Sequence, residues 1–207
     1  MDATLRAILR EDAGAGPAVA EIASDTLAQR IRAVRKEKAL TQAELALQNG
    51  LSHSALSKIE NGHFSPTFET LLRLARGLGV DVSRLLASAE SQPHRTRRVV
   101  TRQGTGERHD SGNYLYETLC TELTNKKMIP LVARIKARDV RQFDRLLSHP
   151  GEELIYVLDG EVEIHMEHYA PVRLGKGDCA YFDSTTGHAC VSTGDHEATV
   201  FWVSTPS

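Results

Sequence analysis

The stretch that decides the fold of the first half of the chain is TQAELALQNGLSHSALSKIENG, which runs from Thr41 to Gly62. Thr41 followed by Glu44 is a capping box that starts a helix. Asn49-Gly50 is a turn in which glycine supplies the positive φ that a tight bend requires. The pattern therefore predicts two short helices packed at a steep angle. Ala46 allows their backbones to approach, and the side chains that face the interior are Leu45, Leu56 and Ile59.

The second helix of this pair has a polar outer face once its apolar residues point inward. Its side chains are short and polar or cationic, and such groups can reach base edges and phosphates in the major groove of DNA. The residues expected on this face are Ser52, His53, Ser54, Ser57 and Lys58.

Helical spacing continues on both sides of this pair. Leu27, Ile31 and Val34 precede it, and leucines recur from Leu71 to Leu86, after a start signal at Ser65-Pro66-Thr67. The spacing predicts five helices within residues 26–88. Residues 1–25 form an acidic N-terminal arm with a short helix expected at residues 2–10, and no role for this arm follows from its composition.

The helical segment resembles the phage-repressor-like, xenobiotic-response-element (XRE) class of helix-turn-helix domains. The matching residues are Thr41-Gln-Ala-Glu-Leu-Ala46, Ser57-Lys-Ile-Glu-Asn-Gly62, Ser65-Pro66 and the leucine-rich run from Leu71 to Val80. The resemblance implies that the partner is double-stranded operator DNA. It also implies that Gln42 and Asn61 contact phosphates, while Ser52, His53, Ser54 and Lys58 approach bases.

The second half of the chain has a different texture. A linker is expected at residues 89–98, and short runs rich in β-branched and aromatic residues follow it, separated by turns such as Asp159-Gly160. The runs begin at Val99, Tyr114, Leu131, Leu154, Glu161, Cys179 and Ala198. The fold class is therefore α+β with two domains, in which residues 99–207 form a β-sandwich or barrel.

Two stretches of this half look like the two motifs of the cupin superfamily, a small double-stranded β-helix barrel. The first is HPGEELIYVLDG, from His149 to Gly160, and the second is GDCAYFDSTTGH, from Gly177 to His188. The first motif usually carries one more histidine, and Leu147 stands in its place. The resemblance implies a sensor and dimerisation domain.

A metal site is expected from His149, Glu153 and His188. Two imidazoles and one carboxylate leave coordination positions open and suit Zn, Fe(II) or Mn. The alternative is that these residues only form hydrogen bonds. Tyr114, Tyr116 and Arg134 are candidates for the mouth of a ligand pocket, although tyrosines on strands are more often packing residues.

Composition and charge limit the remaining classes. The chain has 207 residues and a net charge of −2, yet residues 26–88 carry nine basic against five acidic side chains, and residues 99–207 carry eleven against sixteen. A basic segment beside an acidic one is typical of a polyanion-binding domain that is joined to another domain. Three cysteines without a pairing pattern and the lack of a long apolar run favour a cytoplasmic protein without membrane contact.

Two functions compete, and a third possibility is a DNA-binding protein whose cupin domain is purely a dimerisation scaffold. The first is a transcriptional regulator without catalytic residues, a homodimer whose cupin domain senses a small-molecule effector, a metal or both. The second is a mononuclear non-haem iron cupin enzyme of the hydroxypropylphosphonate-epoxidase type, which also joins a helical domain to a His-x-x-x-Glu…His barrel. The helix-turn-helix is close to the regulator consensus, and no cationic cluster for a phosphonate is evident, so the sequence favours the regulator.

Overall fold

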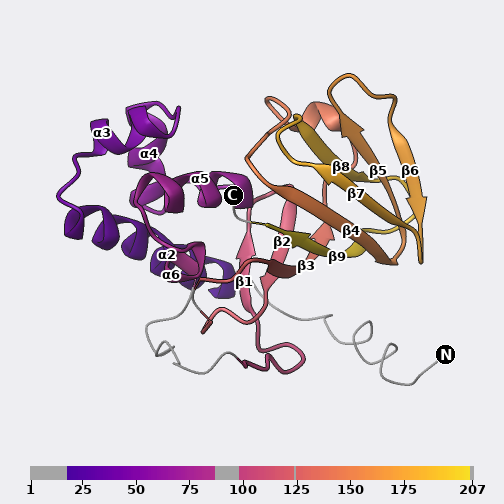
Figure 1. Cartoon of the computed structure of the whole chain (residues 1–207), viewed down its shortest axis with the longest axis horizontal. Helices are drawn as coiled ribbons and strands as arrows, with labels where there is room; N and C mark the ends of the chain where they lie inside the picture. Colours follow the sequence, from indigo (N-terminus) through magenta and orange to yellow (C-terminus); the bar gives the residue numbers. More distant parts are fainter. Residues whose placement is uncertain (1–17, 87–97, 124, 206–207) are drawn as a thin grey trace.

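Five helices form the first half of the described chain in the computed structural model (Figure 1). The structure describes residues 18–86, 98–123 and 125–205. The first helix, α2, begins inside the segment assigned to the N-terminal arm, whereas the helix expected at residues 2–10 lies outside the described residues. The helices are α2 (Ala18–Glu37), α3 (Gln42–Gln48), α4 (His53–Glu60), α5 (Phe68–Gly77) and α6 (Val82–Leu86).

The capping box and the turn predicted around α3 are present. The Thr41 hydroxyl accepts a hydrogen bond from the Glu44 amide at 3.2 Å, and the Glu44 carboxylate accepts one from the Thr41 amide at 2.7 Å. Gly50 has a φ of +61°, which a residue with a Cβ rarely adopts. The chain therefore reverses between α3 and α4 as expected, and the two helices form a helix-turn-helix.

The helical core contains the side chains that the spacing placed inside. These residues have little contact with solvent, and the burial of each contributes roughly 1.5–3 kcal/mol of hydrophobic stabilisation. The fully buried members are Ile31, Leu45, Leu56, Ile59, Leu71, Leu74 and Leu85.

The second half forms two antiparallel sheets. The larger sheet has the strand order β1-β2-β3-β9-β4-β7, and the smaller has the order β6-β5-β8. Side chains on the facing surfaces alternate with outward residues, as the period of two requires. The strands are β1 (Glu107–Asp110), β2 (Tyr114–Thr118), β3 (Ile129–Ile135), β4 (Glu152–Asp159), β5 (Glu161–Met166), β6 (Val172–Gly175), β7 (Cys179–Asp183), β8 (His188–Ser192) and β9 (Ala198–Ser204), with a short 3-10 helix at Val140–Gln142.

The structure corrects some of the strand predictions. Residues 99–101 are not a strand, and Val100 is exposed. Its β-branched side chain favours extended backbone, but a strand also needs a partner to pair with. Three strands (β1, β6 and β8) were not predicted. Most of the linker expected at 89–98 lies outside the described residues.

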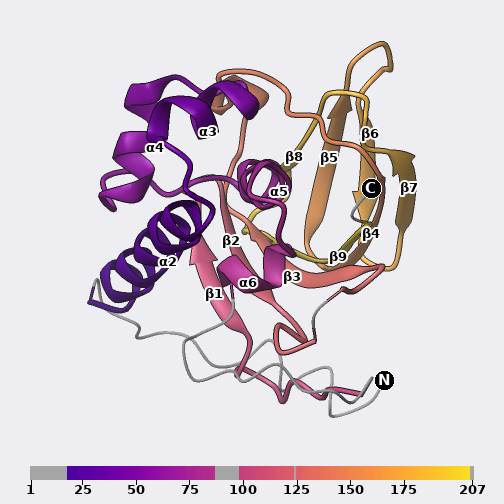
Figure 2. The same cartoon turned by 60° about the vertical axis from the view of Figure 1, so that its left-hand side comes forward.

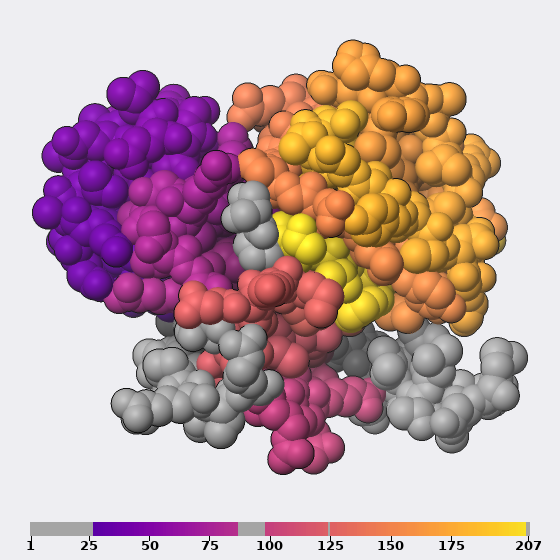
Figure 3. All heavy atoms as spheres, in the orientation of Figure 1, coloured from indigo at the N-terminus to yellow at the C-terminus, as the bar shows by residue number. Residues whose placement is uncertain are grey.

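The two halves pack against each other through α2, which lies against β1, and through α5 and α6 (Figure 2). The Phe68 ring on α5 lies 5.6 Å from that of Tyr116 on β2, and an imidazole nitrogen of His109 bonds to the Pro66 carbonyl. The space-filling view shows the helical and β halves meeting along one face (Figure 3). Among the described helices, none has both the length and the hydropathy that a membrane span requires.

Candidate functional site

The α4 helix lies at the end of the helical half that points away from the sheets (Figure 1). Ser52 caps it by accepting a hydrogen bond from the Ala55 amide at 3.1 Å. Leu56 and Ile59 are buried, which turns the opposite face outward. On that face Ser52, His53, Ser54 and Lys58 are exposed and Ser57 is half-buried, as the sequence predicts.

The two residues expected at phosphates are held at the ends of this motif. The Gln42 amide donates to a Glu60 carboxylate oxygen at 2.8 Å, and Asn61, which is exposed, donates to the Ser57 hydroxyl at 3.3 Å. An amide group has two N–H donors, so each side chain keeps one available for a further acceptor.

Glu60 also pairs with Arg35, which sequence reasoning missed. The guanidinium donates from Nε and Nη2 to the two carboxylate oxygens at 2.6 and 2.8 Å, and both residues are buried. This pair joins α2 to the end of α4. Arg35 is therefore a structural residue rather than a free cation for a phosphate. The spacing gave no sign of the pair, because the two residues lie 25 positions apart.

The predicted metal ligands lie together inside the β half. Their ligand atoms fall within 4.8 Å of one another, and all three residues are buried. His149 Nε2 is 2.9 Å from Glu153 Oε1, and His188 Nε2 is 3.2 Å from Glu153 Oε2. Glu153 stands on β4 and His188 begins β8, so the two sheets contribute to one cluster.

The second nitrogen of each ring fixes its orientation. His149 Nδ1 lies 3.1 Å from the Pro150 carbonyl oxygen and His188 Nδ1 lies 2.9 Å from that of Thr186. Each Nδ1 is placed to donate its proton to the carbonyl, so loss of the proton on Nε2, which faces Glu153, would free a lone pair for a metal. Imidazole ligands of protein-bound metals show this arrangement.

The electrostatics of the cluster favour a cation. Burial raises the pKa of the Glu153 carboxyl, but the hydrogen bonds and positive charge of His149 and His188 outweigh burial and bring the pKa to about 2. Burial lowers the pKa of both histidines, yet Glu153 raises each above its ordinary value. Glu153 Oε2 and His188 Nε2 face each other at 3.2 Å, and neither atom has any other partner in the described residues.

These residues fit a divalent metal. Two imidazole nitrogens and a carboxylate converge, and two of the converging atoms are otherwise unsatisfied. Leu147 stands where a further histidine is usual, and its backbone bridges to His188. A metal held here would therefore keep coordination positions for water or a ligand.

Of the three candidates for a ligand pocket, Tyr114 and Tyr116 lie together with ring centroids 5.5 Å apart, and Arg134 lies apart from them. Tyr114 and Tyr116 point into the interior, where the Tyr114 hydroxyl bonds to the backbone of Cys190 and that of Tyr116 is buried without a partner. Arg134 lies on the opposite face of β3, exposed and 3.2 Å from Glu197. Residues one apart on a strand point to opposite faces, so Arg134 does not share a cavity with the inward residues of β3.

Comparison with known proteins agrees with this geometry. Residues 31–85 match the helix-turn-helix family HTH_3, and residues 142–204 match the cupin domain family Cupin_2. The HTH-type transcriptional regulator y4dJ of Sinorhizobium fredii is 41% identical over 64 residues, which cover 31% of this chain and 83% of y4dJ. The chain belongs to the helix-turn-helix family of transcriptional regulators. It is a DNA-binding regulator of the XRE type with a C-terminal cupin domain.

Two further relatives of this regulator differ in how much they share with it. The HTH-type transcriptional regulator PuuR of Escherichia coli is 24% identical over 180 residues, which cover 84% of this chain and 95% of PuuR. The immunity repressor protein of Bacillus phage phi105 is 44% identical over 61 residues, which cover 30% of this chain and 42% of the repressor. The likeness to the phage protein therefore covers less than a third of this chain.

Solved structures support the fold of the regulator. An HTH_3 family transcriptional regulator from Vibrio cholerae aligns with a TM-score of 0.62 and 20% identity, over 89% of this chain and 97% of that chain. The hydroxypropylphosphonic acid epoxidase of S. wedmorenis aligns over 89% of this chain and 99% of that chain with 22% identity, but its TM-score is only 0.45.

Proposed function

We propose that this regulator binds operator DNA by laying α4 in the major groove. The observation that carries the proposal is the outward face of Ser52, His53, Ser54 and Lys58 on a helix whose other face is buried. Gln42, Ser57 and Asn61 flank this face and contact phosphates or position their neighbours. The geometry of a recognition helix on a rigid bundle supports this role.

The regulator binds as a homodimer, because two recognition helices related by a two-fold axis read a palindromic operator. The outer face of the larger sheet supports self-association. Tyr156 on β4 and Tyr181 on β7 are 41% and 64% exposed, and Leu154 and Phe201 lie on the same face through strand pairing. Light scattering of the purified protein should give a dimer, and Tyr181→Ser should shift the mass toward the monomer.

The cupin domain senses a divalent metal, a small molecule or both. The cluster of His149, Glu153 and His188 supports a metal with open positions, and the contact between α5 and β2 supports communication with the DNA-binding half. An effector can act only through different affinities for the DNA-competent and incompetent arrangements. A metal bound here would supply a Lewis acid, while the two imidazoles and the carboxylate hold it in place.

The alternative is an iron-dependent enzyme, and the same cluster favours it. The two functions differ in what they require of DNA. Fluorescence anisotropy with a duplex from upstream of the protein's own gene, with and without Mn²⁺ or Zn²⁺, distinguishes them. The regulator predicts binding that is stronger than to a scrambled duplex of equal length. Iron-dependent oxygen consumption without any preference for that duplex would favour the enzyme.

A further inference from the structure

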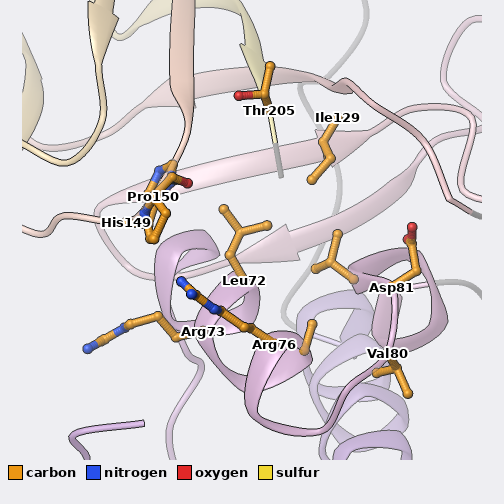
Figure 4. A pocket seen from close by; sticks show the side chains of 11 residues that line it. Leu72, Arg73, Arg76, Val80, Asp81, Ile129, His149, Pro150 and Thr205 are labelled. Atoms are coloured by element: carbon orange, nitrogen blue, oxygen red, sulfur yellow. The ribbon is translucent and has the colours of Figure 1, made fainter. Parts of the chain in front are cut away.

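A pocket lies between the DNA-binding half and the cupin domain, next to the metal cluster (Figure 4). Its volume is about 170 Å³. One wall is the surface of α5 and α6, and the other comes from β3, the loop before β4 and the end of β9. Its lining includes Leu72, Arg73, Arg76, Ile129, His149 and Thr205.

Two arginines of α5 line this pocket, and the guanidinium of Arg73 is turned toward Asn49 and Thr70 at its edge. Figure 4 shows the Arg76 side chain extending along α5 toward His149 and Pro150. The Arg76 side chain forms no hydrogen bond or ion pair within the described part of the chain. Arg73 is half-buried, its Nε has no partner, and its other nitrogens make only long contacts of 3.4 Å to Asn49 and Thr70. Two guanidinium groups are thus left with unused donors.

The charged groups around the pocket do not fully compensate the positive charge of Arg73. Burial and, after it, the positive charge of Arg145 lower the pKa of Arg73, and only Glu69, one turn earlier on α5, acts in the other direction. Asp81 also lines the pocket, but its carboxylate already accepts from the Ser83 amide and hydroxyl and from the Asn125 amide. An anion would therefore relieve the repulsion between cations that the two halves hold near each other.

The rest of the lining is apolar. Leu72, Ala75, Val80, Val82 and Ile129 form most of the wall around the two arginines. Cavities of about 150 Å³ with apolar walls hold a molecule the size of benzene. The pocket thus matches a molecule with a small hydrocarbon body and one anionic group.

We propose that this pocket binds a small organic carboxylate of about the size of benzoate. The carboxylate accepts hydrogen bonds from Arg76, since a planar guanidinium matches a carboxylate in shape and charge, and the positive charge of Arg73 at the edge of the pocket adds to the attraction. The hydrocarbon body packs against Leu72 and Ile129. Binding of the carboxylate does not depend on the proposed function. Its regulatory effect does rest on that function, because a carboxylate here would bridge α5 to the cupin domain and so bias the arrangement of the DNA-binding half.

Isothermal titration calorimetry with benzoate tests the site directly on the full chain. The expected result is binding with a Kd of about 1 mM or tighter. The neutral isostere benzamide should bind at least about tenfold more weakly, since charged hydrogen bonds are lost. Inorganic phosphate, which lacks the hydrocarbon body, should also bind more weakly than benzoate. Equal affinity for benzoate and benzamide, or no binding of benzoate, would overturn the proposal.

Two variants locate the site. Arg76→Gln is the main one, since this exposed side chain is not needed for folding, and it should weaken benzoate binding about tenfold. Arg84→Gln is the matched control, because Arg84 is an exposed arginine of α6 that pairs with Glu37 away from the pocket. Leu72→Phe should also weaken binding by filling the pocket. Unchanged affinity in both Arg76→Gln and Leu72→Phe would contradict the site.

The outcome is separable from the proposed function. If benzoate does not bind while the chain still prefers its own upstream duplex, the pocket proposal fails and the regulator stands. If benzoate binds while no duplex does, the operator-binding role fails and the carboxylate site stands.

Discussion

Arg35 on α2 and Glu60 at the end of α4 form a buried ion pair with two hydrogen bonds, at 2.6 and 2.8 Å. The same carboxylate accepts a third from Gln42 at the start of α3. One acidic side chain therefore ties α4 to both α2 and α3. Glu60 therefore affects function by keeping the helical bundle rigid and not by contacting DNA.

Removal of one partner of this pair should destabilise the protein. Arg35→Ala leaves the Glu60 carboxylate buried without its cation, and breaking a buried pair in this way costs about 3 kcal/mol or more. Urea unfolding measures the change in free energy. Arg32→Ala, a change of an exposed arginine on the same helix, is the control and should alter stability by less than about 0.5 kcal/mol. Equal stability of the two variants would contradict a structural role for Arg35.

The same pair predicts how stability depends on pH. Burial raises the pKa of Glu60, but the hydrogen bonds from Arg35 and Gln42 and the nearby positive charge lower it below its usual value overall. A carboxyl group with a lowered folded-state pKa contributes stability above its unfolded pKa of about 4.3 and loses it as the pH falls through the folded value. The free energy of unfolding should therefore decrease as the pH drops below about 4.5. Glu60→Gln should flatten this part of the curve, and an unaltered acid limb in that variant would count against the pair.

The metal site predicts an effect on both metal content and stability. His149→Ala removes one of three ligands and should lower the amount of Zn²⁺ or Mn²⁺ that the purified chain retains to near zero. His196→Ala is the matched control, because that histidine is exposed and pairs with Asp159 outside the cluster. Mass spectrometry of the metal content provides the measurement. Equal metal content in the two variants would exclude the cluster as the site.

Metal removal should also lower the melting temperature. A ligand that binds only the folded state stabilises it by about 2.7 kcal/mol at one hundred times its Kd. Addition of a chelator to the metal-loaded protein should therefore lower the melting temperature by several degrees, and the chelator should leave Glu153→Gln unaffected. A wild-type melting curve that does not respond to added metal or chelator would be the contrary result.

The helical half could be predicted in detail because its signals are local. The Thr41 cap, the Gly50 turn and the inward Leu45, Leu56 and Ile59 each depend on neighbours within one turn or two, and the structure confirms them. The three metal candidates also come together as predicted, since motif spacing placed them. These features follow from helical period, turn chemistry and strand alternation.

Longer-range features could not be predicted. The strand β8 is buried at all of its positions and shows no alternation, while β1 is polar, so neither has the expected pattern. From the sequence, Arg73 and Arg76 are expected only on the polar face of a helix. Their place in the same pocket lining as His149 follows from the fold. The Arg35–Glu60 pair depends in the same way on contacts between distant segments. Such contacts arise from tertiary packing, which a single sequence does not display.

The measurement that tests the central claim most directly is the salt dependence of DNA binding by Lys58→Ala. Anisotropy with the duplex from upstream of the protein's own gene gives log K against log salt for the wild type, for Lys58→Ala and for the control Lys176→Ala, whose lysine lies on the cupin domain beside Asp159. If α4 lies in the groove, Lys58→Ala should weaken binding and reduce the slope by about one unit, while Lys176→Ala should leave both unchanged. If the wild type has no affinity for any duplex at low salt, or if Lys58→Ala binds with the wild-type slope, then α4 is not the surface that meets DNA.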